Sequence, residues 1–344
     1  MAGIAAEARS GMSFLVPRGR SRRHFVLACA GVLVLAVIGL LTMMLGAVNL
    51  SAGEALSGLA AGSDTLSGLV VGQIRLPRFL DAILVGASLG VAGALLQGVT
   101  RNPLGDPTIF GLTAAAGLAT ATAISINPQI PQWGIVLAAM IGGLGGAGIL
   151  FVIAYRGAVS PVRLALAGVA LSALFGAITV GLIASVRTFI QTTLGFLAGG
   201  LYGSDWTDFR SILPYAIPAL AAALVFAGRL NVLSLGDEVA TGLGVLADRT
   251  RLAILVIAGV LTASAVAIAG LVGFVGLLSP HVARYVAGSD NRYLIPASAL
   301  VGAIIVTAAD LIAKLVITPS EIPMGIITAA VGAPFLLYLV RFKV

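Results

Sequence analysis

The sequence is poor in charged residues, cysteine and histidine. Only 10% of its 344 residues are charged, cysteine occurs once and histidine twice. So few charges exclude an ordinary soluble domain, in which about a quarter of the residues are charged. A single cysteine, Cys29, excludes an internal disulfide framework. His24 and His281 lie in different segments without a carboxylate or thiol at ligand spacing, so we expect no metal site and no resident cofactor.

Catalytic and nucleotide-binding motifs are also missing. Neither of the two lysines, Lys314 and Lys343, follows a glycine-rich loop of the P-loop type, so the chain has no such site for ATP phosphates. No Ser/His/Asp set and no pair of carboxylates is gathered in the apolar segments. We therefore predict that the chain is not an enzyme. Its basic residues are scattered singly between apolar runs, which argues against nucleic-acid binding.

Long apolar runs dominate what is present. Hydrophobic residues make up 59% of the chain and its mean hydropathy is +1.10. A membrane span needs roughly 20 apolar residues, and ten runs of this kind follow one another. The predicted spans are 25–48, 79–98, 107–125, 134–155, 162–186, 212–228, 252–272, 273–288, 294–313 and 324–341. The sequence thus predicts an all-α membrane protein with a tail at 1–24 and one transmembrane domain at 25–344.

Glycine and proline add detail to this pattern. The pairs Gly86/Gly90 and Gly142/Gly146 would each lie on one helix face, which predicts close helix packing within the chain. No polar break separates the seventh and eighth spans. A turn at Gly270, Gly273 and Gly276 is expected there, with Pro280 shortening or kinking the helix that follows.

The distribution of basic residues predicts the orientation. Ten crossings place both termini on the same side of the membrane. If that side is the cytoplasm, fifteen of the 20 basic residues lie inside, as the positive-inside rule requires. The basic residues left outside are Arg75, Arg78, Arg187, Arg210 and Lys314. We expect cytoplasmic N- and C-termini.

Two acidic residues within the spans have basic neighbours in the sequence. Asp81 follows Arg78 by three positions, and Asp310 precedes Lys314 by four, so both are interpreted as local ion pairs on a helix. A secondary transporter is expected to hold ion-coupling carboxylates near the middle of the bilayer. None is evident, so coupling to a proton or sodium gradient is disfavoured.

One stretch, 229–251, is amphipathic rather than uniformly apolar. Leu235, Val239, Leu243 and Leu246 recur at helical spacing between two long apolar segments. Glycines at 236, 242 and 244 are expected to divide the stretch into two short pieces. The topology places this folded loop in the cytoplasm, where it can meet a soluble partner.

Several blocks in register resemble one known family. They are 75–78 (RLPR), 93–98 (GALLQG), 101–107 (RNPLGDP), 235–245 (LGDEVATGLGV), 273–281 (GFVGLLSPH), 309–314 (ADLIAK) and 321–335 (EIPMGIITAAVGAPF). In this order the blocks resemble the iron-siderophore, haem and cobalamin permeases of type II ABC importers, and they are most similar to ferric-enterobactin-type siderophore permeases.

This resemblance implies a ten-helix permease subunit in a bacterial cytoplasmic (inner) membrane. The implied partners are a second permease subunit, two cytoplasmic ATPase subunits and a periplasmic or lipid-anchored substrate-binding protein. Nucleic acid is not among the implied partners. The residues implied to contact the ATPase are Leu235, Gly236, Asp237, Glu238, Ala240, Leu243, Gly244 and Val245. Those implied to receive the binding protein are Arg75, Arg78 and Lys314, where the lysine lacks the bidentate geometry of arginine.

The implied function is import of a ferric siderophore by alternating access, driven by ATP hydrolysis in the separate ATPase subunit. Haem or cobalamin import by the same architecture is the first alternative. A stand-alone secondary transporter or channel is the second, and a structural membrane scaffold is the third.

Overall fold

The computed structural model describes residues 18–60, 65–185, 195–318 and 320–342. Most of the predicted tail at 1–24, together with Arg187 and Lys343, lies outside these residues. The described part is all-helical and holds no β-strand. Its helices are α2 (Arg18–Met44), α3 (Ala52–Ala60), α4 (Leu66–Leu69), the π-helix η2 (Val70–Arg75), α5 (Leu76–Thr100), α6 (Leu112–Ile126), α7 (Gln132–Ala154), α8 (Pro161–Ser185), α10 (Trp206–Ser234), α11 (Asp237–Gly242), α12 (Ala247–Ala269), α13 (Val275–Ala287), α14 (Asn291–Leu315) and α15 (Met324–Phe342).

Each of the ten predicted spans contains a helix, but the helices differ in length. Within the described residues, seven are long and apolar enough to cross a membrane. They are 24–44, 66–100, 132–154, 161–185, 206–234, 247–269 and 291–315. The remaining segments, α6, α13 and α15, have 15, 13 and 19 residues. At 1.5 Å per residue α13 is only about 20 Å long, shorter than the roughly 30 Å hydrocarbon layer.

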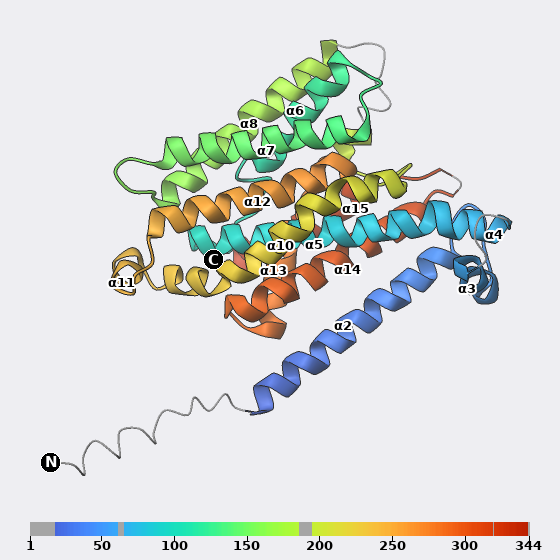
Figure 1. Cartoon of the computed structure of the whole chain (residues 1–344), viewed down its shortest axis with the longest axis horizontal. Helices are drawn as coiled ribbons and strands as arrows, with labels where there is room; N and C mark the ends of the chain where they lie inside the picture. Colours follow the sequence, from blue (N-terminus) through green and yellow to red (C-terminus); the bar gives the residue numbers. More distant parts are fainter. Residues whose placement is uncertain (1–17, 61–64, 186–194, 319, 343–344) are drawn as a thin grey trace.

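Helix α5 lies at the centre of the bundle and packs against α10, α12, α13 and α14 (Figure 1). Small residues allow this packing. A Cβ atom on Gly86 would lie 2.2 Å from the carbonyl oxygen of Gly302 in α14, and one on Gly93 would lie 1.9 Å from that of Gly276 in α13. The predicted role of Gly86 in packing within the chain is therefore confirmed.

The second predicted glycine pair also packs inside the chain. A Cβ on Gly142 of α7 would lie 2.4 Å from the carbonyl oxygen of Ala115 in α6, and one on Gly146 would lie 2.5 Å from the Cβ of the same alanine. These contacts join α6 and α7 closely. Both glycine pairs thus hold helices of one chain together, as the sequence indicates.

The seventh and eighth predicted spans separate at a sharp turn. Helix α12 ends at Ala269, its C-cap Gly270 has φ +67°, and α13 begins at Val275 after Phe274 at φ +67°. The expectation of a turn at Gly270 is confirmed. Gly276 instead lies inside α13, where an added Cβ atom would lie 2.6 Å from the Pro107 side chain and 2.8 Å from that of Asp106, so it allows close packing rather than a turn.

The loop region at 229–251 is shorter than predicted, because α10 continues to Ser234 and α12 begins at Ala247. Between them lies one six-residue helix, α11, rather than two short pieces. Figure 1 shows α11 at one end of the bundle, with the first turn of α2 and the last turn of α15 toward the same end. Helices α3 and α4 lie at the opposite end.

Candidate functional site

The α11 loop presents apolar side chains to solvent. Leu235 is 64% exposed and Leu243 is 62% exposed, and Val239 and Leu246 are exposed as well. These four residues are called the apolar stripe below. An apolar stripe at helical spacing normally packs against the core of its own chain. A stripe that faces outward on a folded loop is typical of a surface that binds another protein.

The other residues predicted in this loop have different environments. Glu238 and Gly244 are exposed, and Gly236 is partly buried with φ +117°. Ala240 is completely buried in the main core cluster, and Val245 is partly buried against the same cluster. Ala240 and Val245 therefore anchor the loop to the bundle, whereas the stripe forms its outer face.

Asp237 fixes α11 to two long helices. Its carboxylate accepts hydrogen bonds from both terminal nitrogens of Arg251 in α12, at 2.7 and 3.0 Å. It also accepts one at 2.6 Å from Arg101, the residue that follows α5. Arg101 in turn donates at 2.8 Å to the carbonyl oxygen of Leu233 in α10. This set, called the Asp237 clip below, connects α11 to the ends of α5, α10 and α12.

The charges of the clip remain in place over the physiological pH range. Hydrogen bonds from the Arg251 guanidinium, followed by the charges of Arg251 and Arg101, hold the pKa of Asp237 below its ordinary value. A carboxyl group whose pKa is lowered in the folded state stabilises the fold at pH values above its pKa in the unfolded chain. This stabilisation is lost only as the pH falls through the lowered pKa of the folded state. The clip is therefore a permanent connection and not a pH switch. Sequence reasoning missed Arg101 and Arg251, because their 150-residue separation along the chain hides their shared partner.

A second cluster lies at the other end of α5. Arg78 and Arg101 are separated by 23 positions, which correspond to about 35 Å along a helix. Arg78 donates to Asp310 of α14 at 2.8 Å and to Glu321 at 2.7 Å. Lys314 binds the second oxygen of Asp310 at 2.8 Å. These four residues, Arg78, Asp310, Lys314 and Glu321, are called the Arg78 network below.

The Arg78 network corrects one expectation and confirms another. The predicted ion pair between Asp310 and Lys314 is present. The predicted pair between Arg78 and Asp81 is wrong, because the guanidinium turns to Asp310 and Glu321 instead. Asp81 is 0% exposed, and neither of its carboxylate oxygens has a hydrogen-bond partner among the described residues. The three-residue spacing of Arg78 and Asp81 along α5 did not reveal that Asp310 of α14 competes for the same arginine.

Arg75, the third basic residue predicted at this end, is also satisfied within the chain. It is buried and donates hydrogen bonds to the carbonyl oxygens of Met43, in the last turn of α2, and of Val48, which follows that helix. These hydrogen bonds from Arg75 therefore hold the last turn of α2, and the segment after it, against η2. All three predicted basic residues hold internal partners at this end of the bundle.

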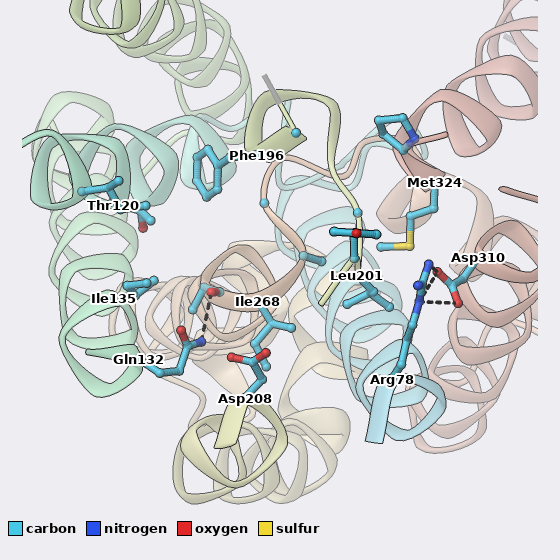
Figure 2. Close-up of a pocket in the computed structure, with 18 of the residues that line it drawn as sticks. Arg78, Thr120, Gln132, Ile135, Phe196, Leu201, Asp208, Ile268, Asp310 and Met324 are labelled. Atoms are coloured by element: carbon cyan, nitrogen blue, oxygen red, sulfur yellow. Dashed lines mark hydrogen bonds and ion pairs between the residues drawn. The ribbon is translucent and has the colours of Figure 1, made fainter. Parts of the chain in front are cut away.

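A cavity of about 660 Å³ opens beside the Arg78 network. Figure 2 shows Arg78 and Asp310 at one side of it and Thr120, Gln132 and Ile135 at the other. Asp208 of α10 also lines it, and the amide of Gln132 donates to the carbonyl oxygen of Ala267 at 3.4 Å. Sequence reasoning missed this cavity, because its lining comes from segments far apart in the chain.

Comparison with known proteins gives consistent matches over most of the chain. The model of the FecCD transport family matches residues 33–342. A Bacillus subtilis protein named as the Fe(3+)-citrate import system permease YfmD is 40% identical over 310 residues, which cover 90% of this chain and 92% of that protein. The cobalamin import system permease BtuC of Halobacterium salinarum is 43% identical over 274 residues, 79% of this chain and 73% of that protein.

A solved structure has the same fold. It is described as an inward-facing conformation of a transporter assigned to the metal-chelate ABC type. The TM-score is 0.81 at 30% sequence identity, and the match covers 92% of this chain and 98% of the other.

Proposed function

The chain belongs to the FecCD transport family, and from this we propose that it is the permease subunit of an ATP-driven importer for a ferric siderophore. The observation that carries the proposal is the exposed apolar stripe on a loop that the Asp237 clip holds rigidly. A chain without a P-loop needs an external source of energy. Reversing a 1:99 conformational equilibrium takes about 5.5 kcal/mol of differential binding, which ATP-driven closure of two docked ATPase subunits would supply.

The proposed architecture has ten membrane crossings with both termini and α11 in the cytoplasm of a bacterial cell. The positive-inside distribution supports this orientation, and so does the location of α11 at the same end of the bundle as the first turn of α2 and the last turn of α15 (Figure 1). The permease domain would then span 25–344 with a coupling loop at about 229–251. A second permease subunit would complete the translocation path.

On the cytoplasmic side we propose that the apolar stripe enters a groove of the ATPase. Leu235 and Leu243 would fill the groove, and Glu238 would meet basic groups at its rim. Gly236 and Gly244 would let the backbones approach closely. The Asp237 clip would transmit ATPase movement to α5, α10 and α12, because the carboxylate binds Arg251 of α12 directly and reaches the ends of α5 and α10 through Arg101.

On the outer side we propose that a substrate-binding protein docks over Arg75, Arg78 and Lys314. Since the head groups of Arg78 and Lys314 already bind carboxylates of this chain, an acidic residue of the partner would have to replace one of them. Glu321 is the carboxylate to be replaced, because its side chain is 27% exposed whereas that of Asp310 is 3% exposed. Docking then exchanges one ion pair for another.

Replacing Glu321 by Gln should therefore tighten binding of the substrate-binding protein. The variant frees one face of the Arg78 guanidinium, and a partly exposed ion pair of this kind corresponds to an affinity gain of up to about five-fold. The gain should shrink as salt is added. Surface plasmon resonance at two salt concentrations measures it. Glu54→Gln is the matched control, since that carboxylate binds Ser51, the residue before α3. An unchanged affinity in Glu321→Gln would count against exchange at Arg78.

Reconstitution tests the function itself. The full chain, copurified with its ATPase and permease partners, is placed in proteoliposomes with the binding protein and ATP. We expect uptake of labelled ferric siderophore only when all components and ATP are present. Uptake at the same rate without the ATPase would refute the proposal and favour a secondary transporter.

A second substrate class is supported by one of the comparisons. The cobalamin permease of Halobacterium salinarum shares 43% identity with this chain, although it matches a shorter segment than the Fe(3+)-citrate permease does. The same proteoliposomes should therefore be given ferric citrate, haem and cobalamin in parallel. The substrate with the highest ATP-dependent rate identifies the class.

A further inference from the structure

A second concave site lies between the end of α10 and the beginning of α12. It is a groove of about 300 Å³, lined by Phe226, Arg229, Leu246, Arg249, Thr250 and Ala253. Apart from Leu246, none of these residues takes part in the proposed coupling surface or in the Asp237 clip. The groove therefore requires an explanation of its own.

The groove holds two guanidinium groups without counter-ions. Arg229 and Arg249 are exposed, and neither forms an ion pair with any carboxylate in the described ranges. Arg229 lies over the ring of Phe226, with its guanidinium carbon 5.0 Å from the ring centre, so its position is defined. The first turn of α12 also lacks a capping side chain, because its N-cap is Leu246. The acidic residue of this turn, Asp248, pairs with Arg251 and accepts a hydrogen bond from the backbone N–H of Val159. The two arginines of the groove are therefore available to an anion.

The surface beside the two arginines is apolar. Val225 precedes Arg229 by four positions on α10, so the two lie on one helix face. Leu252 and Val256 follow Arg249 by three and seven positions on α12, and they share its face in the same way. All three apolar side chains are exposed. Exposed apolar side chains on two neighbouring helices thus lie close along the chain to a pair of cations without ion-pair partners.

We propose that this groove binds the phosphate headgroup of an anionic phospholipid. The guanidinium groups of Arg229 and Arg249 bind the phosphate oxygens, since arginine pairs with phosphate through two parallel hydrogen bonds. The acyl chains lie along Val225, Leu252 and Val256. The charge of the arginines selects an anionic over a zwitterionic lipid, and the apolar side chains select a lipid over free phosphate. This inference rests on the membrane location of α10 and α12 and not on the transport function.

Native mass spectrometry of the purified full chain tests the proposal. The protein in detergent is titrated with phosphatidylglycerol and, separately, with phosphatidylcholine. We expect preferential binding of phosphatidylglycerol. The double variant Arg229→Gln/Arg249→Gln should bind it about 30-fold more weakly, as two basic residues near an anionic headgroup imply. Its binding of phosphatidylcholine should fall much less, because the choline cation of that headgroup already neutralises the phosphate.

Arg210→Gln is the matched control. Arg210 lies near the other end of α10, is exposed, and is located over an aromatic ring in the same way, 5.8 Å from the centre of Trp206. This variant should keep the full preference for phosphatidylglycerol. Thermal unfolding in phosphatidylcholine checks that all variants are folded. If the double variant is not folded, the single variant Arg249→Gln replaces it.

Three results would overturn the proposal. The first is equal phosphatidylglycerol binding by the double variant and the unsubstituted chain. The second is displacement of the bound lipid by millimolar inorganic phosphate, which would assign the site to a free anion. The third is a double variant that keeps its lipid but no longer copurifies with the ATPase subunit, which would make the groove part of the ATPase interface.

Discussion

Leu243→Asp is expected to abolish ATP-driven uptake while leaving the permease inserted and folded. Leu243 is 62% exposed and makes up part of the apolar stripe, so a charge there does not disturb the core of this chain. It would, however, place an unpaired carboxylate in the apolar groove proposed for the ATPase. Loss of a central interface residue costs at least about 2 kcal/mol, which corresponds to roughly 30-fold weaker ATPase binding.

Thr241→Asp is the matched control for this substitution. Thr241 is exposed on the same short helix, two positions from Val239, and thus faces away from the stripe. Copurification of the ATPase, the ATPase rate in the presence of binding protein, and uptake into proteoliposomes are measured for both variants. Normal uptake by Leu243→Asp, or an equal loss in Thr241→Asp, would refute the assignment of the stripe.

Asp310→Asn is expected to lower the thermal stability of the chain more than any other conservative substitution in the Arg78 network. The side chains of Arg78, Asp310 and Lys314 are 9%, 3% and 7% exposed. Without the carboxylate, two buried cations lie beside each other with only Glu321 to compensate. Breaking a buried pair in this way costs about 3–5 kcal/mol, or a fall of roughly 6–10 °C in Tm.

Asp81→Asn provides the contrast, because it is the same substitution at a second buried aspartate. Asp81 has no hydrogen-bond partner among the described residues, so replacement of its carboxyl group by an amide should cost no stability. Lys314→Met added to Asp310→Asn should recover part of the loss, since it removes one of the two uncompensated cations. Equal Tm values for Asp310→Asn and Asp81→Asn would show that the network does not stabilise the fold.

The coupling loop shows how far sequence alone can lead. The spacing of Leu235, Val239, Leu243 and Leu246 predicts a helical apolar face, and the flanking apolar segments predict that it lies outside the membrane. The spacing does not say whether that face turns inward or outward. Asp237 illustrates the same limit. The family resemblance implies that Asp237 contacts the ATPase, but it does not show that Arg101 and Arg251 bind the same carboxylate within the chain.

The positions of the helical segments along the chain were predictable from the sequence, because hydrophobic length acts locally. The same holds for the packing glycines, whose four-residue spacing places them on one face. The spacing along α14 predicted the Asp310–Lys314 pair, but the partner of Arg78 was decided only by the tertiary structure. Arg78 is three residues from Asp81 but binds Asp310, 232 positions away, because the close packing of α5 on α14 places a buried carboxylate within its reach. For this arginine, packing between helices and not distance along the chain fixed the ion pair.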